Sequence, residues 1–148
     1  MRLTRLAAAV SVAAVLSLTI SQSVFAAHAV YKSGSGVIYQ TYGADLDEGA
    51  FNTPYPLGPQ NNDIWFEAVS GTQRYIENNG LDARILRMAS KPGYSTCAHA
   101  TLIKHKYNVA NNAGRWFCVL TNEGRYARFH IDSALSAQPL AITFTTWV

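Results

Sequence analysis

Histidine is the side chain best suited to acid–base chemistry near neutral pH, and the chain has four of them. His130 and Asp132 are two residues apart, so in a strand they share one face, where the carboxylate could orient the imidazole as a base. His99 and His105 lack a standard metal-ligand spacing and a third ligand nearby. The chain has no Gly-x-Ser-x-Gly elbow, phosphate loop or dinucleotide fingerprint. The sequence therefore predicts no catalytic residue, no cofactor and no enzymatic activity.

A short acidic segment is the nearest approach to a metal motif. Asp45, Asp47 and Glu48 precede Gly49, which superficially resembles a calcium-binding loop. The segment lacks a third regularly spaced oxygen ligand and a distal glutamate. We therefore expect a solvated acidic turn and no metal site, with weak calcium binding as the alternative.

Tyrosines are abundant in segments that we interpret as loops or strand ends. An exposed tyrosine can stack on a sugar ring or anchor a protein interface at low entropic cost. The default alternative is ordinary packing with each hydroxyl at the surface. The candidate binding surface consists of Tyr42, Tyr55, Tyr94 and Tyr107.

The N-terminus has the three-part pattern of a secretory signal peptide. Arg2 and Arg5 are followed by an uncharged, mainly apolar run over residues 6–20, then by small residues suited to cleavage after Ala26, or after Ala29. This run is shorter than the ~20 residues of a typical membrane-spanning helix. No cysteine follows it that could carry a lipid. We expect residues 1–26 to be removed and the product to be secreted without a stable membrane anchor.

Cleavage changes the apparent charge of the chain. Removing 26 of 148 residues leaves 122, a length typical of one domain, here residues 27–148. The loss of Arg2 and Arg5 leaves 10 basic and 9 acidic residues, so the net charge falls from +3 to +1. Nucleic-acid-binding proteins usually carry a basic excess or stripe. We therefore expect no nucleic-acid partner.

The two cysteines, Cys97 and Cys118, are expected to form a disulfide because an exported chain enters an oxidising compartment. Closing a loop of 22 residues would stabilise the fold by roughly 3 kcal/mol in the chain-entropy model. The alternative is a catalytic thiol near His99, but a separation of two residues only places both side chains on one face of a strand.

The elements that must carry these residues are predicted to be β-strands. Residues 116–121 are apolar on both faces, as in a doubly covered strand, and residues 125–131 alternate after a turn at Gly124. Residues 43–62 are expected to form a long surface connection. We predict an antiparallel β-sandwich of about seven strands, with a small β-barrel as the alternative. The other expected strands are 36–41, 63–69, 74–77, 83–89 and 140–148. Residues 96–104 are expected to form a further strand or an irregular crossing, and residues 108–114 a loop.

A resemblance supports this interpretation. The segment from Cys118 to Ala127 (CVLTNEGRYA), with Cys97 upstream and a last strand ending in Trp147, resembles small accessory β-domains of secreted bacterial proteins. The likeness covers roughly residues 60–148. It implies the β fold, export and the Cys97–Cys118 pair, and it supplies no activity or catalytic residues.

The function expected from the sequence is a secreted, non-enzymatic module that binds an extracellular protein or polysaccharide. One alternative is a small hydrolase that uses His130 or His99. Another is an inhibitor or toxin that acts on a foreign protein through residues 43–62.

Overall fold

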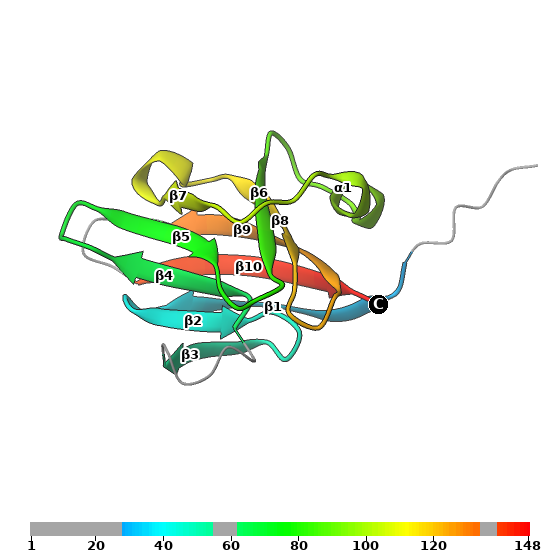
Figure 1. Ribbon diagram of the computed structural model, residues 1–148, viewed down its shortest axis with the longest axis horizontal. Coiled ribbons are helices and arrows are strands. Elements are labelled where there is room, and N and C mark those ends of the chain that lie inside the picture. Colours follow the sequence, from blue (N-terminus) through cyan, green and yellow to red (C-terminus); the bar gives the residue numbers. More distant parts are fainter. Residues whose placement is uncertain (1–27, 55–61, 134–138) are drawn as a thin grey trace, which may run out of the picture.

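The computed structural model describes residues 28–54, 62–133 and 139–148 (Figure 1). The predicted signal peptide, its expected cleavage site at Ala26, and the candidate residue Tyr55 lie outside these residues. No helix among the described residues is long and apolar enough to cross a membrane. The strands are β1 (Val30–Ile38), β2 (Tyr42–Asp45), β3 (Ala50–Pro54), β4 (Ile64–Ala68), β5 (Arg74–Asn78), β6 (Arg84–Met88), β7 (Lys106–Asn108), β8 (Trp116–Leu120), β9 (Tyr126–Ser133) and β10 (Leu140–Trp147).

These strands form two open antiparallel sheets. The order in the first sheet is β1-β10-β9-β8-β6, and the order in the second is β3-β2-β4-β5-β7. The predicted β-sandwich is confirmed, and the barrel alternative is wrong because both sheets have free edges. The described residues hold ten strands instead of about seven.

The additional strands are short. β2 and β3 form a hairpin over residues 42–54, most of it within the segment 43–62 that we expected to be a surface connection, and β7 has three residues. These three segments show no clear apolar alternation in the sequence, so they acquire strand structure from their partners in the sheet.

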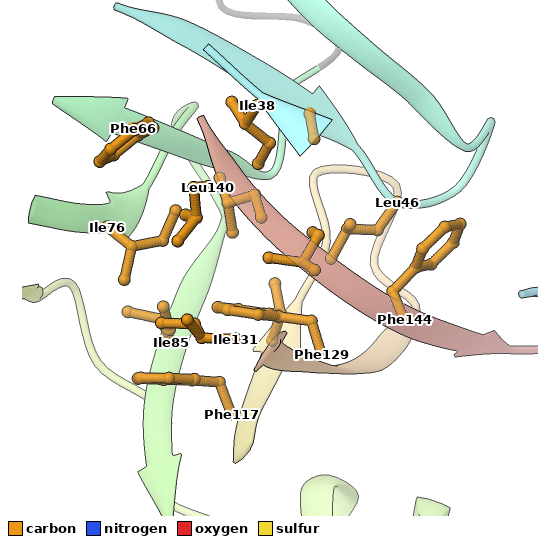
Figure 2. Packing of buried hydrophobic residues seen from close by; sticks show 14 of the residues in the cluster. Ile38, Leu46, Phe66, Ile76, Ile85, Phe117, Phe129, Ile131, Leu140 and Phe144 are labelled. Atoms are coloured by element: carbon orange, nitrogen blue, oxygen red, sulfur yellow. The ribbon is translucent and has the colours of Figure 1, made fainter. Parts of the chain in front are cut away.

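The core fills the space between the two sheets (Figure 2). The rings of Phe117 and Phe129 stack with centroids 4.8 Å apart, and both side chains are fully buried. As the alternating pattern predicts, Ala127, Phe129 and Ile131 of β9 face this core. The strand expected at 116–121 is confirmed as β8, whose Val119 also lies in the core.

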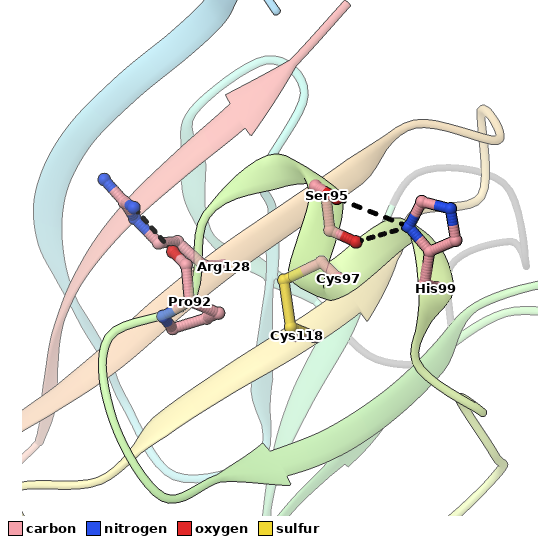
Figure 3. Close-up of a disulfide and its surroundings, with 6 residues drawn as sticks. All are labelled: Pro92, Ser95, Cys97, His99, Cys118 and Arg128. Atoms are coloured by element: carbon pink, nitrogen blue, oxygen red, sulfur yellow. Dashed lines mark hydrogen bonds between the residues drawn. A yellow bond between two sulfur atoms is a disulfide. The ribbon is translucent and has the colours of Figure 1, made fainter. Parts of the chain in front are cut away.

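A second, smaller hydrophobic cluster covers the outer face of the first sheet. It contains Cys97, Cys118 and Trp147, and Tyr94 and Tyr126 pack against it. The predicted disulfide joins Cys97 to Cys118, with an S–S distance of 2.01 Å (Figure 3). This cluster explains why both faces of β8 are apolar, since each face is covered by a different group of side chains.

The expected strand at 96–104 is wrong in its first half. The chain forms a short helix, α1 (Tyr94–His99), and then an irregular crossing in which Ile103 makes one bridge to Ile85. Six residues are too few for helical periodicity to be recognised in the sequence. The helix is held to β8 through Cys97, its one buried residue. A one-turn 3₁₀ helix, η1 (Ala110–Asn112), lies within the loop expected at 108–114.

Candidate functional site

Four carboxylates from three separate loops converge at one end of the sandwich. Asp45 ends β2, Asp47 lies in the β2–β3 turn, Asp63 immediately precedes β4, and Glu123 lies in the β8–β9 hairpin. One ligand oxygen from each of these residues lies within 4.8 Å of the others. We call this group the acidic cluster. The three aspartates are buried, whereas Glu123 is exposed.

Backbone amides hold two of the aspartates in place. Asp45 Oδ1 accepts hydrogen bonds from the backbone N–H groups of Asp47 and Glu48, both at 2.9 Å, which tightens the β2–β3 turn. Asp63 accepts one hydrogen bond at each oxygen, from Leu46 N–H and Asn122 N–H, both at 2.8 Å. Asp63 therefore ties the β2–β3 turn of one sheet to the β8–β9 hairpin of the other.

Asp47 differs from these two because its side chain is only 1% exposed and neither carboxylate oxygen accepts a hydrogen bond from an N–H or alcohol group among the described residues. The nearest cation is Arg125, whose Nη1 lies 3.3 Å from Asp47 Oδ1 in an ion pair. The Arg125 guanidinium also lies 4.0 Å from the centre of the Tyr31 ring. Native proteins rarely leave a buried carboxylate without hydrogen bonds.

Crowding and burial raise the pKa values of three of these carboxylates, those of Asp45, Asp63 and Glu123. Burial raises the pKa of Asp63 to about 8, and it also raises the pKa of Asp45. A hydrogen bond to Asp47, together with burial, raises the pKa of Glu123 to about 7. Each shift reflects carboxylates that face one another or lie out of water, where the charged form is disfavoured.

The imidazole of His99 is bonded to a residue of its own helix, α1. Its Nδ1 lies 2.7 Å from the backbone oxygen of Ser95 and 3.4 Å from the Ser95 hydroxyl (Figure 3). A nitrogen that contacts a carbonyl oxygen must donate its proton to it. The same nitrogen then has no lone pair with which to deprotonate the serine.

The expected pair of His130 and Asp132 is present. His130 Nδ1 lies 2.6 Å from Asp132 Oδ1, and Thr143 donates its hydroxyl proton to Asp132 Oδ2 at 2.7 Å. The threonine hydroxyl therefore bonds the carboxylate of Asp132 and not the imidazole of His130. The centre of the imidazole ring lies 4.6 Å from the centre of the Trp116 ring. In a serine-type site the nucleophile bonds the imidazole. The hydrogen bonds around His130 form no such arrangement.

The candidate tyrosines lie in different surroundings. Tyr42 is 37% exposed at the start of β2. Tyr94 packs against the disulfide cluster, whereas Tyr107 packs against the main core and its hydroxyl accepts the backbone N–H of Arg87. The structure therefore assigns Tyr94 and Tyr107 to separate clusters. A binding role for these side chains stays a prediction.

A basic hollow lies at the other end of β8. Arg87, Met88, Ala89 and Arg115 line a space of about 330 Å³. Both arginines are exposed, and Met88 pairs in register with Trp116. The Lys91 ammonium lies 5.3 Å from the centre of the Trp116 ring. Since Arg115 precedes β8 and Glu123 follows it, the basic hollow and the acidic cluster lie at opposite ends of that strand.

Asp45 and Asp47 were recognised together in the sequence, whereas Asp63 and Glu123, which complete the acidic cluster, were missed. Asp63 was assigned to a strand and Glu123 to a hairpin turn, and nothing in their spacing shows that the two loops meet. The basic hollow was missed for the same reason, because Arg87 and Arg115 are separated by α1 and β7. The available signal was that Asp63, Arg115 and Glu123 lie at or near the ends of predicted strands.

The comparisons with known proteins add no relative. No protein-family model matches the chain, and neither the curated proteins nor the solved structures contain a match.

Proposed function

We propose that the protein is a secreted, non-enzymatic β-sandwich that binds an anionic polysaccharide outside the cell. The observation that carries this proposal is the basic hollow, which is lined by two exposed arginines, Arg87 of β6 and Arg115 immediately before β8. The disulfide between Cys97 and Cys118 is consistent with an oxidising, extracellular compartment.

The charges of the hollow favour an anionic ligand. Arg87 and Arg115 each present a planar guanidinium, which pairs with carboxylate or phosphate groups through two parallel hydrogen bonds. Arg87 Nη1 is 3.4 Å from Asn112 Oδ1, a long contact that leaves its other donors available to a ligand.

The aromatic neighbour favours a sugar. Trp116 is partly exposed, and a tryptophan ring offers a flat apolar face on which a sugar ring can stack. The cations Lys91 and Arg128 lie 5.3 and 5.7 Å from the centre of its ring. Trp116 pairs in register with Met88 and Arg87 pairs with Phe117, so the tryptophan and Arg87 lie on opposite faces of the first sheet, near the same end of β6. A charged sugar polymer that wraps around this edge would meet the guanidinium groups on one face and the stacking surface on the other.

The histidine geometry supports the non-enzymatic part of the proposal. The Nδ1 atom of His99 contacts a carbonyl oxygen, and the hydroxyl beside His130, that of Thr143, bonds Asp132 and not the imidazole, so these contacts activate no nucleophile among the described residues. The hydrolase alternative requires that replacing His99 or His130 by alanine abolish an activity found with a substrate panel.

The test is affinity electrophoresis and calorimetry with a carboxylated, a phosphorylated and a neutral polysaccharide. We expect retention by an anionic polymer that weakens as salt is raised, and little retention by the neutral one. The variant Arg87→Gln/Arg115→Gln should weaken binding about tenfold or more, or roughly 1.4 kcal/mol.

The matched control is Arg84→Gln. Arg84 is at the opposite end of β6 and donates its Nη1 hydrogen bonds to the carbonyl oxygens of Leu81 and Ala83. The Arg84→Gln variant removes one positive charge without altering the hollow, so the affinity for the polysaccharide should change little. Equal losses in Arg84→Gln and in Arg115→Gln would reduce the effect to net charge and contradict the assigned site.

A further inference from the structure

We infer that the acidic cluster is a calcium site built from Asp45, Asp47, Asp63 and Glu123. Three loops that are distant in sequence deliver these carboxylates to one point. The inference is independent of the proposed polysaccharide binding, because the cluster and the basic hollow lie at opposite ends of β8.

The dimensions of the cluster match calcium. Ca²⁺ binds oxygen ligands at about 2.3–2.6 Å, so two ligands on opposite sides of the ion are roughly 5 Å apart. The four ligand oxygens here all lie within 4.8 Å of one another, and one ion can therefore contact all of them. Asp45 Oδ1 and both oxygens of Asp63 already accept backbone N–H bonds, which fix these side chains before any ion arrives.

The buried carboxylate of Asp47 is the independent observation that points to a ligand. Its side chain is 1% exposed, and neither oxygen accepts a hydrogen bond from an N–H or alcohol group among the described residues. Its polar neighbours are the Arg125 guanidinium, 3.3 Å from Oδ1, and the carboxyl group of Glu123, which belongs to the cluster itself. Burying a carboxylate that no amide or alcohol group stabilises is costly, and a cation bound in the cluster would supply the missing interaction.

The charge of the cluster favours a divalent ion. Four carboxylates and the single guanidinium of Arg125 leave three negative charges when all the acids are ionised. A divalent cation would reduce this excess to one. Glu123 is the exposed member of the group, so the site can be reached from solvent.

The chemical nature of the ligands selects calcium among the common metals. The cluster contains carboxylate oxygens and no histidine or cysteine, which disfavours zinc and copper. Mg²⁺ requires a near-ideal octahedron and retains several waters, whereas Ca²⁺ accepts an irregular set of protein oxygens. Carboxylates that come from three separate loops are therefore better suited to Ca²⁺ than to Mg²⁺.

Thermal unfolding of the purified protein tests this inference. The protein is first stripped with a chelator and then titrated with CaCl₂, with MgCl₂ and with NaCl at matched ionic strength. We expect the unfolding temperature to rise with Ca²⁺ by about 10 °C at a concentration 100-fold above the dissociation constant. Isothermal titration calorimetry should give about one site per chain.

The decisive variant is Asp47→Asn, with Asp82→Asn as its control. The asparagine keeps the shape of the side chain but removes its charge, so the Ca²⁺-dependent rise should disappear while the chelated protein unfolds at or above the wild-type temperature. Asp82 is an exposed residue before β6, and its variant should respond to Ca²⁺ like the wild type. If Asp47→Asn does not fold, Glu123→Gln on the exposed side should weaken Ca²⁺ binding about tenfold.

Three results would overturn the inference. The first is an unfolding temperature and a calorimetric signal that do not change with 10 mM Ca²⁺. The second is unchanged Ca²⁺ binding in both Asp47→Asn and Glu123→Gln. The third is an equal response to Mg²⁺ and Ca²⁺, which would contradict the choice of ion. Loss of polysaccharide binding in the Arg87→Gln/Arg115→Gln variant would affect none of these measurements.

Discussion

Removing the disulfide by the double substitution Cys97→Ala/Cys118→Ala is expected to lower the free energy of unfolding by about 4–5 kcal/mol. The cross-link joins α1 to β8 across a sequence separation of 21 residues. In the chain-entropy model, opening a loop of this length gives the unfolded chain freedom worth about 3.3 kcal/mol at 25 °C. The two fully buried sulfurs also pack beside Trp147, and deleting them costs roughly 1 kcal/mol in addition.

Urea denaturation followed by tryptophan fluorescence measures this change. The wild type in reductant loses the cross-link but keeps both sulfur atoms, so it should be destabilised by about 3 kcal/mol, less than the alanine variant. Both uncross-linked forms should show a steeper dependence on urea because their unfolded chains are more expanded.

The alanine variant serves as its own control, since added reductant should leave its unfolding curve unchanged. A change of less than about 1 kcal/mol on reducing the wild type would refute the loop-closure argument. Two free thiols in peptide mapping without reductant would refute the disulfide itself.

Two further predictions concern the backbone turns and the packing beneath α1. Gly124→Ala should lower the free energy of unfolding by about 1 kcal/mol because Gly124 has a φ of 80°, which alanine rarely adopts. The control is Gly93→Ala, which should lower it by less than about 0.5 kcal/mol because Gly93 has a φ of −91°. An added Cβ meets nothing within 4 Å at either position, so equal losses in urea denaturation would contradict the role of φ. Arg128→Met should lower the free energy of unfolding by about 1–2 kcal/mol, because the guanidinium donates a hydrogen bond to Pro92 O at 2.6 Å and lies 5.1 Å from the centre of the Trp147 ring. An unchanged urea midpoint would show that these contacts contribute nothing to stability.

The long strands of the first sheet were predictable because their sequences alternate over enough residues. Phe129 and Ile131 of β9, and Ile142 and Phe144 of β10, all enter the core as their period of two requires. Trp147 lies on the opposite face of β10, as the same alternation requires. Its burial could not be predicted from the sequence, because the cover comes from α1 and the disulfide, which depend on tertiary structure.

The acidic cluster could be predicted only in part, since a local pattern indicates a turn but not which turns meet. Asp45 and Asp47 are close in sequence and were recognised together. Asp63 and Glu123 join them through the order of the second sheet and through the hydrogen bonds of Asp63 to both loops. That order depends on strand pairings, such as β2 with β4, that bring sequence-distant segments together and have no local signature.

The pairing of β1 with β10 restricts the order in which the fold can be completed. Among the described strands, β1 pairs with β10 alone, and Val30 pairs with Trp147 while Ile38 pairs with Leu140. A chain that emerges from a ribosome with its N-terminus first therefore needs its last residues before β1 can join the sheet. Closing contacts over such sequence distances is slow, so β1 would stay unpaired until late in folding. The same connectivity that completes the sandwich would thus delay folding until the whole chain is available.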